Sequence, residues 1–243
     1  MHVVDTTVFF SPTSGGVKRY LMAKHAWYAA HTPWRHTLLV PGEREQFAPG
    51  GLSTLRGIKV PGTFNYRLPI DPPRWSAMLA ALEPDLIEVG DAFHPAWCAT
   101  QVAQRRGIPL VAFFHSNLPQ LVTQRMGTAI GAGFARYVRW LYARFDAVLA
   151  PSRYMRDYLR SLGVTRVICQ PLGVDVETFN PAQRTLDVRR ELGLGEDTRL
   201  LVFAGRFSGE KNLSVLFEAF ARLGKPYHLL LIGGGEAKSF APN

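Results

Sequence analysis

Short apolar segments alternate along the chain with longer segments in which apolar residues recur every three or four positions. The first pattern is typical of buried parallel strands, and the second is typical of amphipathic helices that cover them. The short segments lie at residues 3–4, 37–40, 58–60, 85–89, 110–114, 147–150 and 166–169. This alternation, from residue 1 to about 170, predicts an α/β fold with a doubly wound, mostly parallel sheet.

Capping residues mark the ends of the predicted helices. Asp71 followed by Pro72 indicates a helix start, and Gly107 indicates the end of a helix over 95–106. Ser152 is expected to cap the start of a later helix. One predicted helix carries on a single face Trp75, Met78, Leu79 and Leu82. These signals place the helices between the strands, as the doubly wound fold requires.

A second α/β unit is predicted after a connector at residues 171–181. An apolar strand at 200–204 leads through a turn into a helix, and a further strand is expected at 227–232. We therefore expect two Rossmann-like domains, an N-terminal one over 1–180 and a partial one over 181–243. Two strands are fewer than a full sheet needs, so an unpaired edge and an uncovered apolar face are expected there.

The turn after the strand at 200–204 carries two cations, Arg206 and Lys211. Ser208 is expected to cap the helix that follows, and the amides at a helix start favour an anion. Two cations beside such amides suit a diphosphate. The alternative is that both are ordinary solvated surface charges.

Two glycines, Gly15 and Gly16, stand between the first strand and the next helix. Without side chains, they let a ligand approach the backbone amides closely. The alternative is a plain tight turn. The dinucleotide fingerprint G-x-G-x-x-G and its acidic partner about 20 residues on are both missing, which disfavours an NAD-dependent enzyme.

The 243 residues carry a formal net charge of +9. This charge allows nucleic acid, an anionic membrane face or phosphorylated substrates as partners. None of the common nucleic-acid-binding motifs is present, so we expect no nucleic-acid partner. Residues 125–160 contain seven Arg, no Lys and two Asp. Among them Arg136, Trp140 and Arg144 form an i, i+4, i+8 stripe, which is either a solvated helix face or a contact with an anionic membrane.

Cysteine and histidine usage predicts no metal site. Cys98 and Cys169 lie in apolar surroundings at unpatterned spacing, so we expect buried free thiols. The seven His form no cluster with Cys. No apolar run reaches the ~20 residues of a membrane span, and the first residues resemble a strand and not a signal peptide. A cytoplasmic protein is expected, with peripheral association at the cytoplasmic membrane face left open.

Six stretches together resemble the retaining GT-B glycosyltransferases of the glycogen-synthase-like group, which includes bacterial mannosyl- and glucosyltransferases. They follow the family's order over essentially the whole chain, at residues 15–20, 115–119, 150–152, 171–181, 205–212 and 231–236. The resemblance implies an acceptor-binding domain and a nucleotide-sugar-binding domain that face each other across a cleft. It also implies transfer of a hexose, of mannose or glucose type, from a nucleotide-diphosphate sugar to a glycan or lipid-linked acceptor with retention.

The resemblance also assigns roles to particular residues. Gly15 and Gly16 would offer amides to the donor diphosphate, and Arg206 and Lys211 would bind it and stabilise the leaving group. Preorganised cations stabilise that charge most in the transition state, so no metal or other cofactor is expected. His115 is similar to the family's histidine beside the transferred sugar, where we expect it to position the sugar and not to act as a general base. His115, Arg206 and Lys211 are thus the predicted catalytic residues.

Further residues are expected to position the acceptor or the sugar. Asn117 stands where many relatives have Asp, which argues against an acid–base role and suggests an effect on acceptor choice. Asp91 and His94 follow another strand end, where ligands bind in open α/β sheets. Their alternative role is helix capping. Asp175 is expected to order the turn between the domains.

The family's pair of glutamates in the second domain, one for the ribose and one for the sugar, has no counterpart in this sequence. We therefore expect a chain that is truncated in its second domain and inactive, or nearly so, on its own. The alternative function is a non-catalytic α/β protein that binds a sugar, a nucleotide or nucleic acid.

Overall fold

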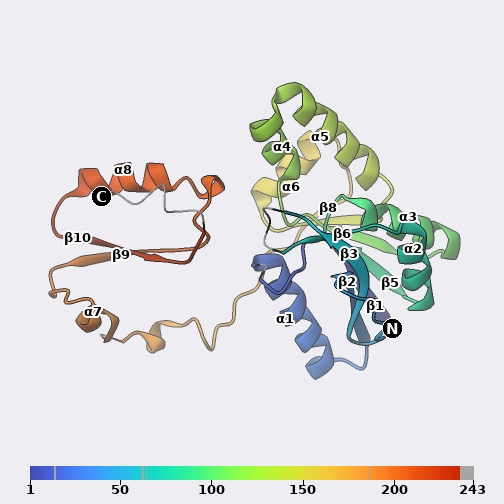
Figure 1. The fold of residues 1–243 in the computed structure, drawn as a ribbon, viewed down its shortest axis with the longest axis horizontal. Coiled ribbons are helices and arrows are strands. Elements are labelled where there is room, and N and C mark those ends of the chain that lie inside the picture. Colours follow the sequence, from blue (N-terminus) through green and yellow to red (C-terminus); the bar gives the residue numbers. More distant parts are fainter. Residues whose placement is uncertain (14, 62, 64, 186, 236–243) are drawn as a thin grey trace. The chain divides into compact units, whose positions relative to one another are not determined.

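The computed structural model describes residues 1–13, 15–61, 63, 65–185 and 187–235. The chain divides into two units, Met1–Gly173 and Val174–Asn243, which are described separately below. Figure 1 traces both units along the sequence.

An eight-stranded sheet forms the centre of the first unit, in the order β4-β3-β2-β1-β5-β6-β7-β8. The strand pairs are parallel, except that β4 runs antiparallel to β3. The strands are β1 His2–Thr6, β2 Arg35–Gly42, β3 Leu52–Lys59, β4 Arg67–Pro69, β5 Leu86–Val89, β6 Leu110–Phe113, β7 Ala147–Ala150 and β8 Val167–Cys169. The predicted α/β fold with a mostly parallel sheet is confirmed.

The strand order reverses at β1, which lies between β2 and β5. From this point the chain adds strands first toward β4 and then toward β8. In open α/β sheets, ligands bind beyond the carboxyl ends of the strands at such a switch point. The loops that follow β1 and β5 are therefore the expected position of a binding site.

Helices cover both faces of this sheet. They are α1 Gly16–His31, α2 Pro72–Ala81, α3 His94–Arg106, α4 Leu118–Met126, α5 Thr128–Tyr142 and α6 Arg153–Ser161. Leu38 and Val40 of β2 pack with Leu21 of α1, whereas Leu39 belongs to the larger core, which also contains residues of α2 and α3. Alternate residues of one strand thus point to opposite faces.

The predicted capping signals of the first unit are confirmed. The Asp71 side chain accepts a hydrogen bond from the Arg74 amide, and Ser152 accepts one from Met155. Gly107 ends α3 in the left-handed conformation, at φ 66°. The predicted apolar face of α2, with Trp75, Met78, Leu79 and Leu82, is buried.

The sequence prediction was wrong along β3 and β4. The short strand expected at 58–60 corresponds only to the end of β3, which begins at Leu52, and β4 was not predicted. Along β3 the buried positions alternate: Ser53, Leu55 and Gly57. A strand that mixes small polar and apolar residues contains no apolar run that the sequence would reveal.

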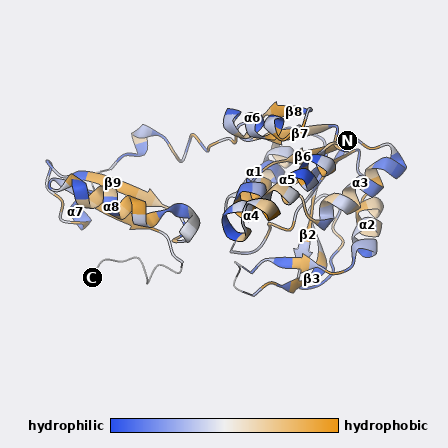
Figure 2. Ribbon diagram, turned by 90° about the horizontal axis from the view of Figure 1, so that it is seen from above, coloured by the Kyte–Doolittle hydropathy of each residue, from blue (hydrophilic) through white to orange (hydrophobic). Residues whose placement is uncertain are grey.

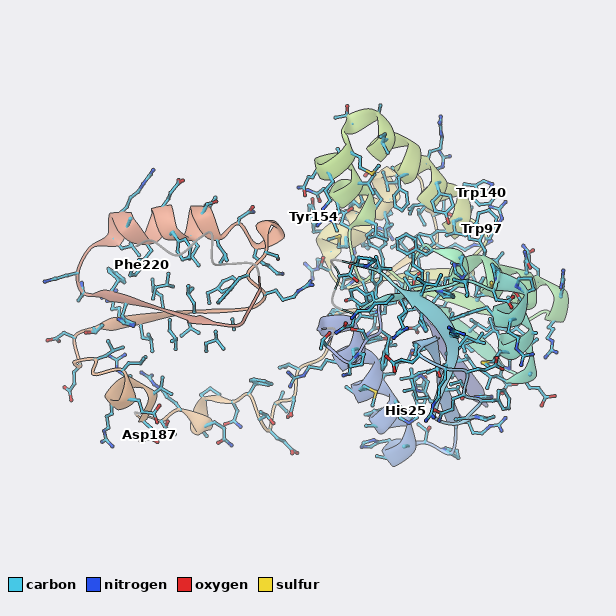
Figure 3. The ribbon with its side chains drawn as sticks, in the orientation of Figure 1. His25, Trp97, Trp140, Tyr154, Asp187 and Phe220 are labelled. Carbon is cyan, nitrogen blue, oxygen red and sulfur yellow. The ribbon has the colours of Figure 1, made fainter. Side chains whose placement is uncertain are left out.

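The second unit contains a two-stranded parallel sheet of β9 Arg199–Ala204 and β10 Tyr227–Ile232. Its helical segments are η1 Pro181–Gln183, α7 Asp187–Glu191, η2 Gly209–Lys211 and α8 Leu213–Leu223. In Figure 3 the Phe220 side chain extends from α8 toward the strands. Both strands are predominantly apolar in Figure 2, and Val202 remains 56% exposed, as expected for a sheet with an uncovered face.

Candidate functional site

Three loops meet at the carboxyl edge of the central strands. A Cβ atom added to Gly90, directly after β5, would lie 3.1 Å from Thr7 Cβ and 3.4 Å from His115 Cδ2. The loop after β1 and the loop after β6 therefore pack against the same glycine. A side chain at this position would require Thr7 or His115 to move by a few tenths of an ångström. The predicted residues Asp91, His94, His115 and Asn117 all follow β5 or β6 here.

The Asp91 carboxylate ties two of these loops together. It accepts hydrogen bonds from the Val8 amide at 2.6 Å, the Thr7 hydroxyl at 2.8 Å and the Phe93 amide at 2.8 Å. Burial raises the pKa of this carboxyl, although the three hydrogen bonds oppose the shift. Asp91 orders the loops around β1 and β5 and is itself buried. Its contact with an acceptor remains a prediction.

The His115 imidazole lies between two aromatic rings. It is parallel to Phe113, with the centroids 4.3 Å apart, and it meets the Tyr20 ring edge-on at 5.0 Å. Burial lowers the pKa of His115 to about 4, so the imidazole is neutral at physiological pH. Its Nε2 atom is buried and has no hydrogen-bond partner in the described part of the chain. A neutral imidazole with an unused nitrogen suits hydrogen bonding to a hydroxyl group.

Asn117 caps the helix that follows His115. Its Oδ1 atom accepts a hydrogen bond from the Gln120 amide at 3.2 Å, and its Nδ2 atom donates to Gln120 Oε1 at 2.9 Å. The side chain thus has partners on both ends of its amide. Its predicted effect on acceptor choice remains a prediction.

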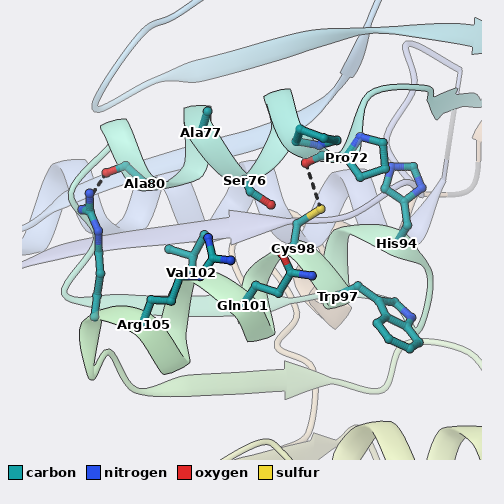
Figure 4. A pocket seen from close by; sticks show the side chains of 12 residues that line it. Pro72, Ser76, Ala77, Ala80, His94, Trp97, Cys98, Gln101, Val102 and Arg105 are labelled. Carbon is teal, nitrogen blue, oxygen red and sulfur yellow. Dashed lines mark hydrogen bonds between the residues drawn. The ribbon is translucent and has the colours of Figure 1, made fainter.

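His94 begins α3 and lies at one end of a groove between α2 and α3, as Figure 4 shows. The groove has a volume of about 930 Å³. Along it Cys98 Sγ donates to the Pro72 carbonyl at 3.4 Å. Burial lowers the pKa of His94, and its Nε2 atom, like that of His115, has no partner in the described chain. Contact between His94 and an acceptor remains a prediction.

The start of α1 is open to solvent. Gly15 precedes the helix without a side-chain cap, and Gly16 is its first residue. A Cβ atom at either position would meet nothing within 4 Å, so packing does not explain the glycines. The first amides of a helix have no partner within it, and the first turn of α1 carries no acidic residue. Gly15 and Gly16 are both exposed, and anion binding by their amides remains a prediction.

A buried charged cluster lies beneath α1, and sequence analysis missed it. Lys24 Nζ lies 2.8 Å from Glu88 Oε2 and 3.0 Å from Asp5 Oδ2, and its side chain is 15% exposed. The Tyr20 hydroxyl donates to Glu88 Oε1 at 3.3 Å, and His36 Nε2 lies 3.0 Å from Asp5 Oδ2. The available signal was an acidic residue next to apolar residues in each of two short strands, β1 and β5.

The pKa values of the charged cluster follow from burial and from mutual attraction. Burial disfavours the charge on Lys24, but Asp5 and Glu88 outweigh it and hold the pKa of Lys24 above its ordinary value. Burial also raises the pKa of Glu88, aided by the nearby charge of Asp5. For Asp5, Lys24 and His36 outweigh burial and lower the pKa.

In the second unit, the predicted diphosphate-binding turn follows β9. Arg206 lies in this turn and Lys211 ends η2, and both side chains are exposed. The turn is tied to the glycine-rich turn after β10, because Gly205 donates to the Ile232 carbonyl at 2.9 Å and Phe207 to Gly234 at 3.0 Å. Glu236, at the end of that turn, lies outside the described residues. Diphosphate binding by Arg206 and Lys211 remains a prediction.

The predicted cap at Ser208 is wrong. The helix α8 begins five residues later in sequence, at Leu213, after the short turn η2. The Ser208 hydroxyl has no partner among the described residues, and Asn212 precedes α8 in the left-handed conformation. Because η2 intervenes, Ser208 stands before a turn and not before the helix.

Two residues of the predicted stripe, Trp140 in the last turn of α5 and Arg144 just after the helix, have aromatic neighbours. The Arg144 guanidinium carbon lies 3.6 Å from the Trp140 ring centroid, and Trp140 lies 5.0 Å from the Trp97 ring of α3. Figure 3 shows both tryptophans at the same part of the surface. Each remains 42% exposed. No helix in the described residues is long and apolar enough to cross a membrane.

Cys98 and Cys169 are free thiols, as predicted, but Cys169 is only half-buried. The described residues contain no group of three or more His, Cys, Asp or Glu side chains that could hold a metal ion.

Comparison with known proteins agrees with the fold and the motifs. The profile of Glycosyltransferase Family 4 matches residues 14–178. The GDP-mannose-dependent alpha-(1-6)-phosphatidylinositol dimannoside mannosyltransferase of Mycobacterium tuberculosis is 29% identical over 247 residues, which cover 98% of this chain. The sulfoquinovosyl transferase SQD2 of Arabidopsis thaliana is 27% identical over 68% of this chain and 33% of its own length.

Solved structures share the fold. The sucrose-phosphate synthase of Thermosynechococcus elongatus has a TM-score of 0.71 at 19% identity, covering 98% of this chain and 63% of that one. HepE of Anabaena, in complex with UDP, has a TM-score of 0.68 at 15% identity, covering 99% of this chain and 63% of that one. At these identities the likeness concerns the fold alone.

The fold is therefore the Rossmann-like α/β fold of the GT-B glycosyltransferases. The chain belongs to glycosyltransferase family 4. It spans 64% of the length of the mycobacterial mannosyltransferase.

Proposed function

We propose that this chain takes part in transferring a hexose from a nucleotide-diphosphate sugar to a glycan or lipid-linked acceptor, with retention. The observation that carries the proposal is the neutral His115 imidazole in the loop after β6, next to the switch point of the sheet. It is held between two rings, and its Nε2 atom has no partner among the described residues. The relatives support the substrate class, because they include a mycobacterial GDP-mannose-dependent phosphatidylinositol dimannoside mannosyltransferase. The retaining outcome rests on the family resemblance.

The proposed chemistry exchanges one bond at the sugar carbon. The bond from that carbon to the diphosphate oxygen breaks, and a bond to the acceptor oxygen forms on the same face. The acceptor proton passes to the departing phosphate. In this scheme His115 positions the sugar by hydrogen bonding and does not act as the base, because an imidazole with a pKa of about 4 is a weak base.

The leaving nucleoside diphosphate gains negative charge as the bond breaks. Arg206 and Lys211, together with the amides at Gly15 and Gly16, would stabilise that charge. Preorganised donors aimed at developing charge commonly provide the largest single contribution to catalysis. We propose on this basis that transfer needs no metal ion.

Calorimetric titration of the 243-residue chain with GDP, UDP and ADP tests the donor assignment. We expect one nucleotide to bind best, and Arg206→Ala and Lys211→Ala each to weaken its binding by about 10- to 100-fold, because a hydrogen bond to a charged group contributes roughly 1.5–3 kcal/mol. Arg222→Ala, which removes an exposed cation from α8, is the matched control. Binding of no nucleotide, or equal losses in all three variants, would contradict the proposal.

We also propose peripheral contact with an anionic membrane through α5, at the cytoplasmic face. The support is the exposed Trp140, with Arg144 stacked on it and Arg136 one turn before it. Tryptophan and arginine together are suited to the headgroup region of a bilayer. Co-sedimentation with phosphatidylglycerol vesicles should fall in the double variant Arg136→Glu/Arg144→Glu. Unchanged co-sedimentation would remove this proposal, and Arg105→Glu/Arg106→Glu on α3 controls for net charge.

A further inference from the structure

The helix α1 has little apolar attachment to the sheet. Of its sixteen residues, Gly16–His31, Leu21 is the fully buried one. Val17 and Tyr20 add partly buried contacts with the cluster that contains Leu38. A surface helix normally holds its position by a broad apolar stripe. The position of α1 must therefore depend on other contacts.

Ring contacts near the end of α1 supply part of the attachment, because Tyr28 stacks on His36 of β2 with the centroids 4.9 Å apart. Toward the middle of the helix, Lys24 forms two ion pairs with the sheet. Its Nζ atom reaches Asp5 on β1 and Glu88 on β5, so a single side chain binds α1 to two adjacent strands. Because the cation is largely buried, these contacts are little screened by solvent. Both carboxylates have further partners, His36 for Asp5 and Tyr20 for Glu88.

The same side of α1 carries the residues that face the proposed site. Gly16, Tyr20 and Lys24 are spaced four residues apart, so they lie along one side of the helix. Tyr20 provides the ring that meets His115 edge-on, and Gly16 lies at the open helix start. A rotation or shift of α1 would move both features together.

We infer that Lys24 is a positioning residue: by binding Asp5 and Glu88 it fixes α1, and so sets Tyr20 against His115 and Gly16 at the helix start. The importance of this arrangement for sugar transfer rests on the proposed function. The arrangement itself does not, and it can be measured without any nucleotide or sugar.

A merely stabilising contact would not need charges. Well-packed apolar residues of similar volume often stabilise a fold as well as a buried ion group does. Lys24 fixes the position of α1 along the sheet, because its ammonium binds two carboxylates at set positions on the strands. An apolar side chain in its place would allow the helix to slide. The inference therefore concerns geometry and is tested by a geometric readout.

The test is NMR of the His115 imidazole in the 243-residue chain. At neutral pH, its ring-proton shifts report the neighbouring Tyr20 and Phe113 rings, and its titration midpoint reports its burial. We expect Lys24→Met to move the shifts and to raise the midpoint from about 4 toward the ordinary value of 6.5. Tyr20→Leu should have the same effect, whereas Tyr20→Phe, which keeps the ring, should resemble the wild type.

Charge and folding are controlled separately. Loss of the nearby Lys24 charge alone raises the midpoint, so the shifts at neutral pH decide whether the rings have moved. Lys59→Met, the same substitution at an exposed lysine of β3, is the matched control. If Lys24→Met does not fold, the charge-balanced variant Lys24→Met/Glu88→Gln replaces it.

The inference is overturned if folded Lys24 variants keep the wild-type His115 ring-proton shifts at neutral pH, even where the midpoint rises through loss of the Lys24 charge. Nucleotide titration of the same proteins separates this result from the proposed function. If the wild type binds no nucleotide while the His115 signals move as expected, the proposed function fails and the positioning role stands. If the wild type binds nucleotide while the signals do not move, the positioning role alone fails.

Discussion

The imidazole of His115 lies parallel to the ring of Phe113, with an interplanar angle of 14° and centroids 4.3 Å apart. Phe113 ends β6, and the His115 amide donates to the Phe113 carbonyl at 3.0 Å, so the chain turns directly after the strand and the two rings lie together. Tyr20 closes another side of the imidazole from α1. Aromatic neighbours on two sides leave little room for the water that would solvate a charged imidazole.

This burial makes the stability of the first unit depend on pH. The folded pKa of His115 is about 4 and the unfolded value is 6.5, so the unfolded chain binds more protons between these values. Stability should therefore fall as pH decreases from about 6.5 to about 4, by at most about 3 kcal/mol. Urea unfolding across this range measures the slope, and the His115→Asn variant should show a smaller one. If the unfolding free energy changes with pH equally in both proteins, groups other than His115 cause the pH dependence.

The glycine-rich turn after β10 should not tolerate a side chain at its first position. Gly233 has φ 150°, and a Cβ atom there would lie 1.9 Å from the Gly205 carbonyl oxygen. We expect Gly233→Ala to destabilise the turn by about 1–3 kcal/mol. Hydrogen exchange of the Gly205 and Phe207 amides, which donate across to this turn, measures the effect. Gly234→Ala is the control, because its Cβ would meet nothing within 4 Å.

Removing the Asn117 side chain should weaken the start of α4. Asn117→Ala deletes the cap on the Gln120 amide and should cost about 1 kcal/mol of unfolding free energy. Asn117→Asp keeps an acceptor for that amide and should cost much less. Thermal and urea denaturation of the two variants give the comparison, and equal losses would show that the cap is not the source of the effect.

Removing the buried cation alone should reduce the free energy of unfolding more than removing the cation together with both carboxylates. Lys24→Met leaves Asp5 and Glu88 close together without their shared partner, and we expect a loss of about 3–5 kcal/mol. Adding Asp5→Asn and Glu88→Gln should restore part of that loss, because no uncompensated buried charge remains. Urea unfolding of the single and triple variants measures the difference. A triple variant no more stable than the single one would contradict this account.

Sequence patterns predicted the elements that depend on local signals. The buried strands, the cap at Asp71 and the stop at Gly107 all follow from residue type and spacing, and each is found in the structure. The strand β3, which lies between β2 and the edge strand β4, was predicted too short because its alternating small residues give no apolar run. Ser208 was predicted to cap the helix α8 because the sequence does not distinguish the start of that helix from the turn η2 that precedes it.

Long-range pairing explains what the sequence could not show about the site. His115 was singled out, but its neighbour Tyr20 is far away along the chain and meets it only through the fold. Asp5 and Glu88 stand on strands that become adjacent only at the switch point of the sheet. The residue that unites them, Lys24, reads in the sequence as an ordinary helix lysine.

The buried cluster continues outward through a second pair of side chains. The Asp5 carboxylate contacts His36 Nε2, and the other ring nitrogen of His36, Nδ1, lies 3.2 Å from His25 Nδ1. With both rings neutral, the hydrogen that His36 directs at Asp5 occupies Nε2, so His36 Nδ1 is an acceptor and His25 must carry its hydrogen on Nδ1. One carboxylate thus dictates the tautomers of two successive histidines. Both hydrogen bonds therefore have the same direction: His25 donates to His36, and His36 donates to Asp5, from α1 toward the centre of the sheet.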